Sequence, residues 1–571
     1  MLKKLFPFLD WFPIKTIDLK DDLVAGITVA LLLVPQSMAY AELAGLPVRY
    51  GLYAAIIPVA LMALFGKMAQ ISGGPTAMTG IITASVLFPL VQDIPPELRE
   101  ARYIELAILL SLTVGVCRLL MGVFKLSSLV NLLSHPVIAG FTNAAAIVIA
   151  LSQLPKLLGI SGISIQQEFM GLIKSLASFA NNLDQIHPLS AITGVISLLG
   201  LVYLKKIYRK VPWPLIIVAG SCFVFWKFGI QDEALIVGEI PNSFPSLSFP
   251  KNSQGEWLDT IILLIPASIM ITLIGFVETV SISKAISFKT RQPMNLDQEL
   301  IGQGIGSIAG AFAQAYPVGS SFTRSALNLV SGARTGMSNI FAVLSVIFVL
   351  LFLTPALYYL PKATLAALII SSTFGLIDFE PIRVSWRVMR REGLVAIFTF
   401  VATLCFAPSI MDGFLWGAGI SIAAYLYRTM KPRIDIYDWS ESCPSDLRTR
   451  SLHIAALRFR CAIFFASVEA FEEAIITCLA QSKNVKFMLI EAQSINRIDA
   501  SGEWGLRNLV NQLKSHNVEL VFAALPAEAK EMMNKTQLDQ LIGEENFYPD
   551  TTSAIHALHE RINGRNLEYM I

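Results

Sequence analysis

Charged side chains are scarce in this chain. Asp, Glu, Lys and Arg make up 15% of its 571 residues, against about 25% in an ordinary soluble domain. Hydrophobic residues make up 54%, and the mean hydropathy is +0.60. A disordered chain is excluded, because such chains combine low hydrophobicity with high net charge. A soluble globule is also a poor fit to this composition.

Metal ligands and basic tracts are equally sparse. The six cysteines form no Cys-x-x-Cys motif, and His556 and His559 are a close pair without a second pair beside them. We therefore expect no metal site, no cofactor and reduced cysteines. No basic tract accompanies the net charge of +2, so a nucleic-acid partner is not expected.

The charge that is present is concentrated at the C-terminal end. Residues 434–571, about a quarter of the chain, hold 32 of the 86 charged side chains. This contrast predicts a transmembrane domain over 23–430 and a soluble domain over 435–565. Residues 1–22 lack the apolar region of a signal peptide, and we expect them to lie along the cytoplasmic surface of the membrane.

The first 430 residues have room for about 14 membrane spans, since a span with its loop takes about 30 residues. Apolar segments lie at 23–44, 50–66, 75–91, 104–124, 133–153, 189–204, 212–229, 258–281, 298–315, 320–332, 338–354, 362–376, 393–408 and 412–427. Lys67, Arg334 and Arg383 fall in one set of alternate loops, and Asp93 and Glu97 fall in the other. The positive-inside rule then places both termini in the cytoplasm.

Two of these segments are short and follow glycine and proline at matching places in two seven-span halves. Segment 75–91 begins after Gly73-Gly74-Pro75, and segment 320–332 follows Pro317 and Gly319. A helix that starts inside the membrane leaves its first N–H groups unpaired and adds the positive end of its dipole. Two such helices in an inverted repeat would form a site for a small anion. Close packing of small residues is the alternative explanation.

Two charged residues stand inside apolar spans. A charge such as that of Arg324 costs about 2.5 kcal/mol or more in a membrane. We expect it to face the bundle interior, either to attract an anion or to pair with Glu278. Burial disfavours the ionised form of a carboxyl group, which suits Glu278 to carry a proton. On span one, Pro35 frees a carbonyl group, and Gln36 and Tyr40 share a face four residues apart.

Several motifs resemble one known family. The stretch from Val34 to Pro47 (VPQSMAYAELAGLP), Ile71–Pro75 (ISGGP), Asn295–Gly302 (NLDQELIG) and Ser321–Asn328 (SFTRSALN) are similar to the SulP sulfate-permease anion transporters. The resemblance runs over nearly the whole chain. It implies seven-plus-seven inverted repeats in an α-helical polytopic membrane protein. Spans 1–4 and 8–11 would form a moving core, spans 5–7 and 12–14 would form a gate, and access would alternate by an elevator movement.

The resemblance also implies functional residues. An anion would bind between spans 3 and 10, and Glu278 would be linked to ion coupling. Substrate-binding positions would be Gln36, Tyr40, Thr76, Ala77, Phe322, Thr323 and Arg324. Thr76 and Met78 depart from the pattern of many animal relatives, which weakens the transfer of a substrate from those relatives.

The C-terminal residues alternate between predicted strands and helices. Strands are predicted at 452–459, 461–465, 485–491 and 518–524, and helices at 466–480 and 501–515, which indicates a small α/β domain. Asp499 or Ser501 is expected to cap the helix that follows. The stretch Asp499-Ala500-Ser501-Gly502 resembles the turn of STAS domains, so Ser501 is a candidate for regulatory phosphorylation as well as a helix cap. No pair of nucleophile and base suggests an enzyme.

These observations predict a secondary transporter for sulfate or a similar small anion, with H⁺ as the coupling ion. The alternatives are a Na⁺-coupled bicarbonate transporter, an H⁺-coupled dicarboxylate transporter, an uncoupled exchanger or channel, and a membrane-anchored sensor. The expected partners are a small inorganic or carboxylate anion, membrane lipids, a second copy of the chain in a homodimer and a cytoplasmic protein bound by the STAS domain. The expected location is the bacterial inner membrane.

Overall fold

The chain forms two compact units, Met1–Ser421 and Ile422–Ile571, in a computed structural model. The structure describes residues 6–13, 15–128, 134–160, 171–204, 207, 213–230, 232, 235–253, 257–407, 409–430, 432–436, 453–481 and 484–568. The predicted domain limits at 22, 430, 435 and 565 stay predictions.

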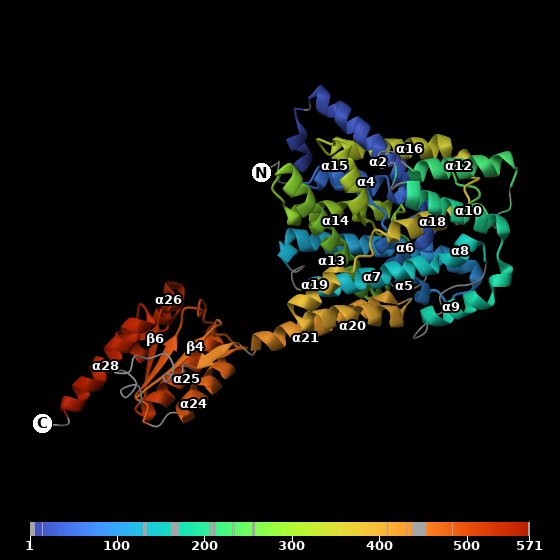
Figure 1. Ribbon diagram of the computed structural model, residues 1–571. Coiled ribbons are helices and arrows are strands. Elements are labelled where there is room, and N and C mark those ends of the chain that lie inside the picture. Colours follow the sequence, from blue (N-terminus) through green and yellow to red (C-terminus); the bar gives the residue numbers. More distant parts are fainter. Residues whose placement is uncertain are drawn as a thin grey trace. The chain divides into compact units, whose positions relative to one another are not determined.

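All fourteen predicted apolar segments are helical in the first unit, where the helices run side by side (Figure 1). The first seven are α2 (Thr16–Leu43), α3 with α4 (Arg49–Ala54, Ile57–Phe65), α5 (Ala77–Leu90), α6 (Pro96–Val123), α7 (His135–Ser152), α10 with η4 (Pro188–Leu199, Gly200–Leu204) and α12 (Trp213–Lys227). The second seven are α13 (Trp257–Thr290), α14 (Leu296–Phe312), α15 (Phe322–Val330), α16 with η5 and α17 (Met337–Phe348, Val349–Leu353, Thr354–Leu357), α18 (Lys362–Thr373), α20 (Arg390–Phe406) and α21 (Ile410–Met430). Six described helices are both long and apolar enough to cross a membrane.

Short helices also occupy stretches that were predicted as loops. These are α8 (Leu154–Leu158), α9 (Gly171–Asn181) and α19 (Glu380–Val388). In α19 no residue is buried, and the apolar side chains of Val384, Trp386 and Val388 are exposed. A short amphipathic helix of this kind has too little total hydrophobicity to be recognised by a search for apolar runs.

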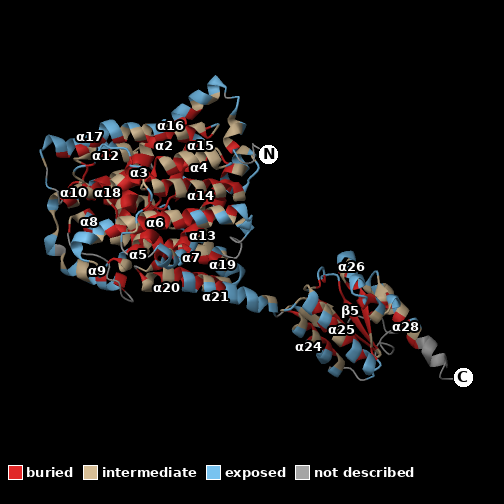
Figure 2. Cartoon of the chain, turned by 180° about the vertical axis from the view of Figure 1, so that it is seen from behind, coloured by how far each residue is buried: buried red, intermediate tan, exposed pale blue. Residues whose placement is uncertain are grey.

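Helices from the two halves pack closely against one another. The closest packing joins α14 to α6 and α4, and α16 to α2. Glycines permit this approach, because a Cβ atom on Gly115 would lie 2.7 Å from the backbone nitrogen of Ile308 and one on Gly304 would lie 2.6 Å from that of Leu119. Buried residues concentrate on these inner helices, while the C-terminal half of α21 is largely exposed (Figure 2).

The second unit is a small α/β domain. Its sheet has the order β3 (Ile434–Ile436), β4 (Ile454–Phe459), β5 (Phe487–Glu491), β6 (Glu519–Ala523) and β7 (Phe547–Tyr548), parallel except for the β3–β4 pair. The helices of this unit are α24 (Val468–Gln481), α25 (Ala500–Ser515), α26 (Ala527–Lys535), α27 (Leu538–Ile542) and α28 (Thr551–Glu568).

Alternate residues of its central strands enter two different cores. On β5, Met488 and Ile490 pack in the core that includes α24 and α25, and Phe487 and Leu489 pack in the core that includes α28. Helices therefore cover both faces of the sheet, as expected of parallel strands. Cys478 of α24 lies in the first core, where burial raises the pKa of its thiol and keeps it protonated.

The strand predicted at 461–465 is wrong. Only Ile463 makes a bridge, a parallel one to Ile498, and the chain then turns. The turn forms because the Ser467 hydroxyl accepts a hydrogen bond from the Phe464 N–H and the Asp499 carboxylate accepts one from the Phe465 N–H. Residue 452, the predicted start of the first strand, lies outside the described residues.

Candidate functional site

The two short helices begin at a pair of very short strands inside the first unit. β1 (Gly73–Gly74) pairs antiparallel with β2 (Gly319–Ser320), with Gly73 opposite Ser320. Because the strands are antiparallel, α5 and α15 leave the pair in opposite directions, and both N-termini lie at the pair. With 14 and 9 residues, they are about 21 and 14 Å long, well short of an apolar layer of about 30 Å.

Each helix start is also joined to the opposite strand. Ser72 donates its backbone N–H to the Ser325 hydroxyl at 2.9 Å and accepts from the Ser321 N–H at 3.0 Å. Gly74 has a φ of +125°, a backbone conformation that favours glycine, and its Cβ position would lie 3.4 Å from the Arg324 guanidinium. The two half-helices thus form one unit, as the sequence predicted.

Hydroxyl side chains cap both helices, but some backbone N–H groups of the first turns remain without a hydrogen-bond acceptor. Thr76 and Thr79 form a capping box at the start of α5, and Ser321 caps α15 by accepting from the Arg324 N–H. Within the described part of the chain, the backbone N–H groups of Ala77, Met78, Phe322 and Thr323 have no hydrogen-bond partner. Two sets of unpaired donors, each at the positive end of a helix dipole, therefore meet at the strand pair.

Arg324 supplies a full positive charge to the same place. Its side chain is completely buried, and it donates to the Gln36 side-chain oxygen and to the Gly73 carbonyl group, both at 3.3 Å. The expected alternative, an ion pair with Glu278, does not form at ion-pair distance among the described residues. Both hydrogen-bond acceptors of Arg324 are neutral, so no carboxylate among the described residues neutralises the guanidinium by direct contact.

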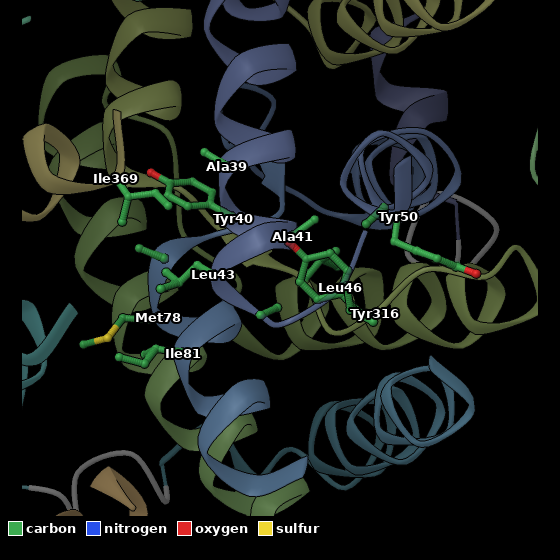
Figure 3. Packing of buried hydrophobic residues seen from close by; sticks show 14 of the residues in the cluster. Ala39, Tyr40, Ala41, Leu43, Leu46, Tyr50, Met78, Ile81, Tyr316 and Ile369 are labelled. Atoms are coloured by element: carbon green, nitrogen blue, oxygen red, sulfur yellow. The ribbon is translucent and has the colours of Figure 1, made fainter. Parts of the chain in front are cut away.

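The predicted site residues do not all have the same exposure. Gln36 and Tyr40 follow Pro35 on α2 and are buried, and Thr76 and Ala77 are buried at the start of α5. Tyr40 lies beside Ile369 of α18, and Met78 and Ile81 of α5 lie near Leu43 (Figure 3).

Phe322 and Thr323 open α15 and stay exposed. The structure thus brings Gln36, Thr76 and Ala77 to the strand pair with Arg324. Phe322 and Thr323 lie at its accessible edge.

Glu278 lies on α13, half-buried, and the charges of Arg118 and Arg324 both act on it. Arg118 of α6 was missed by the sequence analysis. It is fully buried and donates to the Val318 carbonyl group at 2.7 Å and the Ser307 hydroxyl at 3.2 Å. Its position inside the apolar segment 104–124 could have identified it as a functional candidate from the sequence.

A cluster of uncharged hydrogen-bonding side chains joins β2 to helices α13 and α14. The Gln303 amide of α14 donates to the Thr279 hydroxyl of α13 at 2.8 Å and to the Ser320 hydroxyl at 3.2 Å. These bonds join two helices to the strand from which α15 begins, so the position of the second half-helix depends on α13 and α14.

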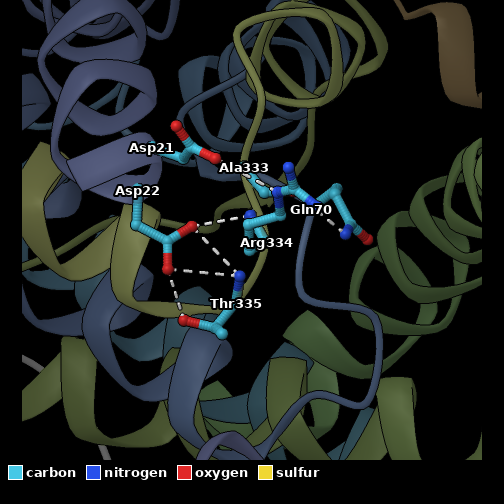
Figure 4. Close-up of polar contacts among 6 residues, drawn as sticks. All are labelled: Asp21, Asp22, Gln70, Ala333, Arg334 and Thr335. Atoms are coloured by element: carbon cyan, nitrogen blue, oxygen red, sulfur yellow. Dashed lines mark hydrogen bonds and ion pairs between the residues drawn. The ribbon is translucent and has the colours of Figure 1, made fainter. Parts of the chain in front are cut away.

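The loop after α15 is held by the N-terminal part of α2. The buried Asp22 carboxylate accepts from the Arg334 N–H at 2.7 Å and from the Thr335 N–H and hydroxyl at 3.0 and 2.6 Å (Figure 4). Asp22 is therefore a buried residue of α2. This helix begins at Thr16, before the predicted start of the apolar segment at residue 23.

In the second unit, Asp499 rather than Ser501 caps α25, accepting from the Gly502 N–H at 2.8 Å. Ser501 is exposed in the first turn. Phosphate there would lie at the positive end of the helix dipole. No cluster of three or more metal-ligating side chains occurs among the residues described.

A cavity of about 1010 Å³ lies between α2, α12 and α16. No charged side chain lines it, and neither Gln36 nor Arg324 contributes to its wall. It fits apolar chains rather than an anion.

Comparisons with known proteins agree with this architecture. The model of the sulfate permease family matches residues 19–399, and the model of the STAS domain matches 448–554. Sulfate transporter 4.1 (chloroplastic) of Arabidopsis thaliana is 32% identical, over 96% of this chain and 81% of that protein. A probable sulfate transporter of Mycobacterium tuberculosis is 30% identical, over 95% of this chain and 96% of that protein.

Solved structures share the fold at lower identity. The overall structure of SLC26A9 superimposes with a TM-score of 0.87 at 18% identity, over 99% of this chain and 94% of that chain. The transmembrane domain of the cyanobacterial bicarbonate transporter BicA gives a TM-score of 0.59 at 20% identity, over 72% of this chain and 98% of that chain.

Proposed function

Since the chain belongs to the sulfate permease family, whose members are integral membrane transporters and not enzymes, we propose that it moves sulfate or a similar small anion across the membrane. The observation that carries the proposal is the meeting of two half-helix N-termini with the buried Arg324. Unpaired N–H donors and a guanidinium group stabilise an anion without fixing its exact shape.

We propose that Gln36, Tyr40, Thr76, Ala77, Phe322, Thr323 and Arg324 contact the anion. Gln36 and the Gly73 carbonyl group hold the Arg324 guanidinium in place. The N–H groups of α5 and α15 then supply donors from two sides, which suits a tetrahedral oxyanion with oxygens in all directions. Phe322 and Thr323, being exposed, are placed for the entering anion.

We propose an elevator movement for access to the two sides. Helices α2, α4, α6, α13, α14, α15 and α16 make most of their contacts with one another, and α7, α10, α18 and α20 form a second packed group. Between the groups, Glu42 of α2 forms an ion pair with Lys156 of α8 at 2.9 Å. Such contacts at the boundary would break and reform as the first group moves.

We propose H⁺ as the coupling ion, with Glu278 as its carrier. A proton on Glu278 would offset the charge of an anion bound near Arg324, so both would cross together at lower electrostatic cost. A bacterial inner membrane with both termini in the cytoplasm, a homodimer, contacts with lipids and a cytoplasmic partner for the STAS domain complete the proposal.

The test is uptake of radiolabelled sulfate into proteoliposomes, with bicarbonate and succinate compared under imposed H⁺ and Na⁺ gradients. Sulfate uptake driven by an inward H⁺ gradient is the expected result. Uptake that ignores both gradients would instead indicate an exchanger or a channel. No flux of any anion in the intact protein would favour a sensor.

A further inference from the structure

Arg118 is a second buried cation near the half-helices. Its exposed fraction is 0%, and its two hydrogen-bond acceptors, the Val318 carbonyl group and the Ser307 hydroxyl, are both neutral. Its Nε and its second terminal nitrogen have no hydrogen-bond partner among the described residues. Burying a guanidinium without a counter-charge is unfavourable, so a compensating negative charge is expected near these two nitrogens.

The unpaired side of Arg118 is directed at α13. A Cβ atom on Gly275 would lie 2.9 Å from the second terminal nitrogen of Arg118, so the guanidinium crosses α13 where a glycine leaves room. Glu278 follows three residues later, one helical turn along the same face. The charges of Arg118 and Glu278 act on each other, and the effect of Arg118 on Glu278 exceeds that of Arg324.

Arg324 is held differently. Its two hydrogen bonds go to Gln36 and Gly73, on the side of α2 and β1. The two arginines therefore face different partners. Arg118 lies against the turn of α13 that precedes Glu278, without an ion pair to it among the described residues, and Arg324 faces the strand pair and α2.

We propose that Arg118 is a positioning residue that acts as the resident counter-charge of Glu278, so that the carboxylate does not neutralise Arg324 and Arg324 remains available to the transported anion. The inference rests on the proposed function and adds a reason for two fully buried arginines, Arg118 and Arg324, in one bundle. When Glu278 takes up a proton, Arg118 loses its counter-charge while it still holds the Val318 carbonyl group beside β2. Proton uptake by Glu278 would thereby change the contact between Arg118 and the residue that precedes β2, the strand from which α15 continues.

The other groups around Glu278 are less suited to serve as its counter-charge. Besides Arg118, helix α6 has Cys117, which acts on Arg118. Helix α15 has Arg324, and α2 has Tyr40, on which the charge of Glu278 acts. Helix α14 and strand β2 present the neutral Gln303 and Ser320, and no titratable side chain of α5 is among the described groups that act on Glu278.

The test is the pH dependence of sulfate uptake in proteoliposomes made from the full chain. Without its cation, Glu278 would ionise less readily, so Arg118→Gln should move the midpoint of the pH profile to more alkaline pH by about one unit, a tenfold change in proton concentration. Arg118→Lys, which keeps a charge, should restore most of the wild-type profile. Ser307→Ala is the matched control, because it removes a neutral partner of Arg118 and should leave the midpoint unchanged.

The outcomes separate the two levels of the argument. A wild-type protein that moves no anion counts against the proposed function, and the inference falls with it. A wild-type protein with pH-independent uptake, or an Arg118→Gln profile that coincides with wild type, overturns the inference alone. If Arg118→Gln does not fold, as judged by gel filtration, Gly275→Ala replaces it. This change keeps every charge but pushes the guanidinium from α13, and it should move the midpoint in the same direction.

Discussion

At the scale of single residues, the interior of the bundle holds two fully buried arginines, Arg118 and Arg324, and the half-buried Glu278. An arginine at the centre of a membrane helix costs about 2.5 kcal/mol or more. Arg324 offsets part of this cost with two hydrogen bonds. On the proposed function, a bound anion would offset more of it.

Replacing Arg324 should therefore abolish transport while leaving a folded protein. We expect Arg324→Ala to lower initial sulfate uptake at least tenfold, because hydrogen bonds to charged groups contribute about 1.5–3 kcal/mol. Its melting temperature in detergent should not fall, since a buried charge has been removed. Arg334→Ala, at an exposed loop arginine, is the control. Wild-type uptake by Arg324→Ala would contradict the placement of the site.

Glu278 gives a second prediction at this scale. Glu278→Gln keeps the shape and loses the exchangeable proton, so uptake should no longer respond to an imposed H⁺ gradient. Exchange of labelled for unlabelled sulfate should persist, because the donors at the strand pair are untouched. Equal stimulation of variant and wild type by an H⁺ gradient would remove Glu278 from the coupling path.

At the scale of elements, the helices were predictable and the contacts between them were not. Each apolar run longer than about 13 residues became a helix, because no other structure satisfies backbone groups in lipid. The half-helices were also foreseen, from glycine and proline before a run of hydroxyl residues. The role of Arg118 was not foreseen, because one arginine in segment 104–124 gives no sign of the partner it faces on α13. The turn at 463–467 was missed because the bonds of Ser467 and Asp499 override an apolar strand pattern.

The loop between α15 and α16 depends on Asp22 of α2. Asp22→Ala would leave the part-buried N–H groups of Arg334 and Thr335 without their acceptor, at a total cost of about 1–3 kcal/mol. We expect a lower melting temperature in detergent, measured by the loss of the monodisperse gel-filtration peak after heating. The melting temperature of Asp22→Asn should lie between those of Asp22→Ala and wild type, since the amide keeps one oxygen that can accept a hydrogen bond.

The neighbouring Asp21 provides the control for that measurement. Its carboxylate pairs with the Arg334 side chain at 3.2 Å, but both groups are well exposed, and exposed pairs contribute about 0–1 kcal/mol. Asp21→Ala should therefore melt close to wild type. A similar loss in both variants would mean that general charge near α2, and not the buried contact, stabilises the loop.

At the scale of the whole molecule, the proposed transport site and the candidate regulatory serine lie in two different units. The half-helices, Arg324 and Glu278 all lie in Met1–Ser421, and Ser501 lies in Ile422–Ile571. Asp499 caps α25 and also accepts from the Phe465 N–H, so the start of α25 is fixed without help from Ser501. The serine is exposed and available for modification without loss of the helix cap.

This division gives a prediction about kinetics. If a charge at Ser501 regulates transport, Ser501→Glu should change the maximal rate of sulfate uptake about two-fold or more and leave KM unchanged, since no anion contact is altered. Ser515→Glu, on an exposed serine in the last turn of the same helix, controls for added charge, although a negative group is less favourable there. A change in KM without a change in rate would place the effect of Ser501 on the anion site itself. Identical kinetics for Ser501→Glu, Ser501→Ala and wild type would leave Ser501 as a surface residue of the first helical turn and would point regulation to another part of the STAS domain.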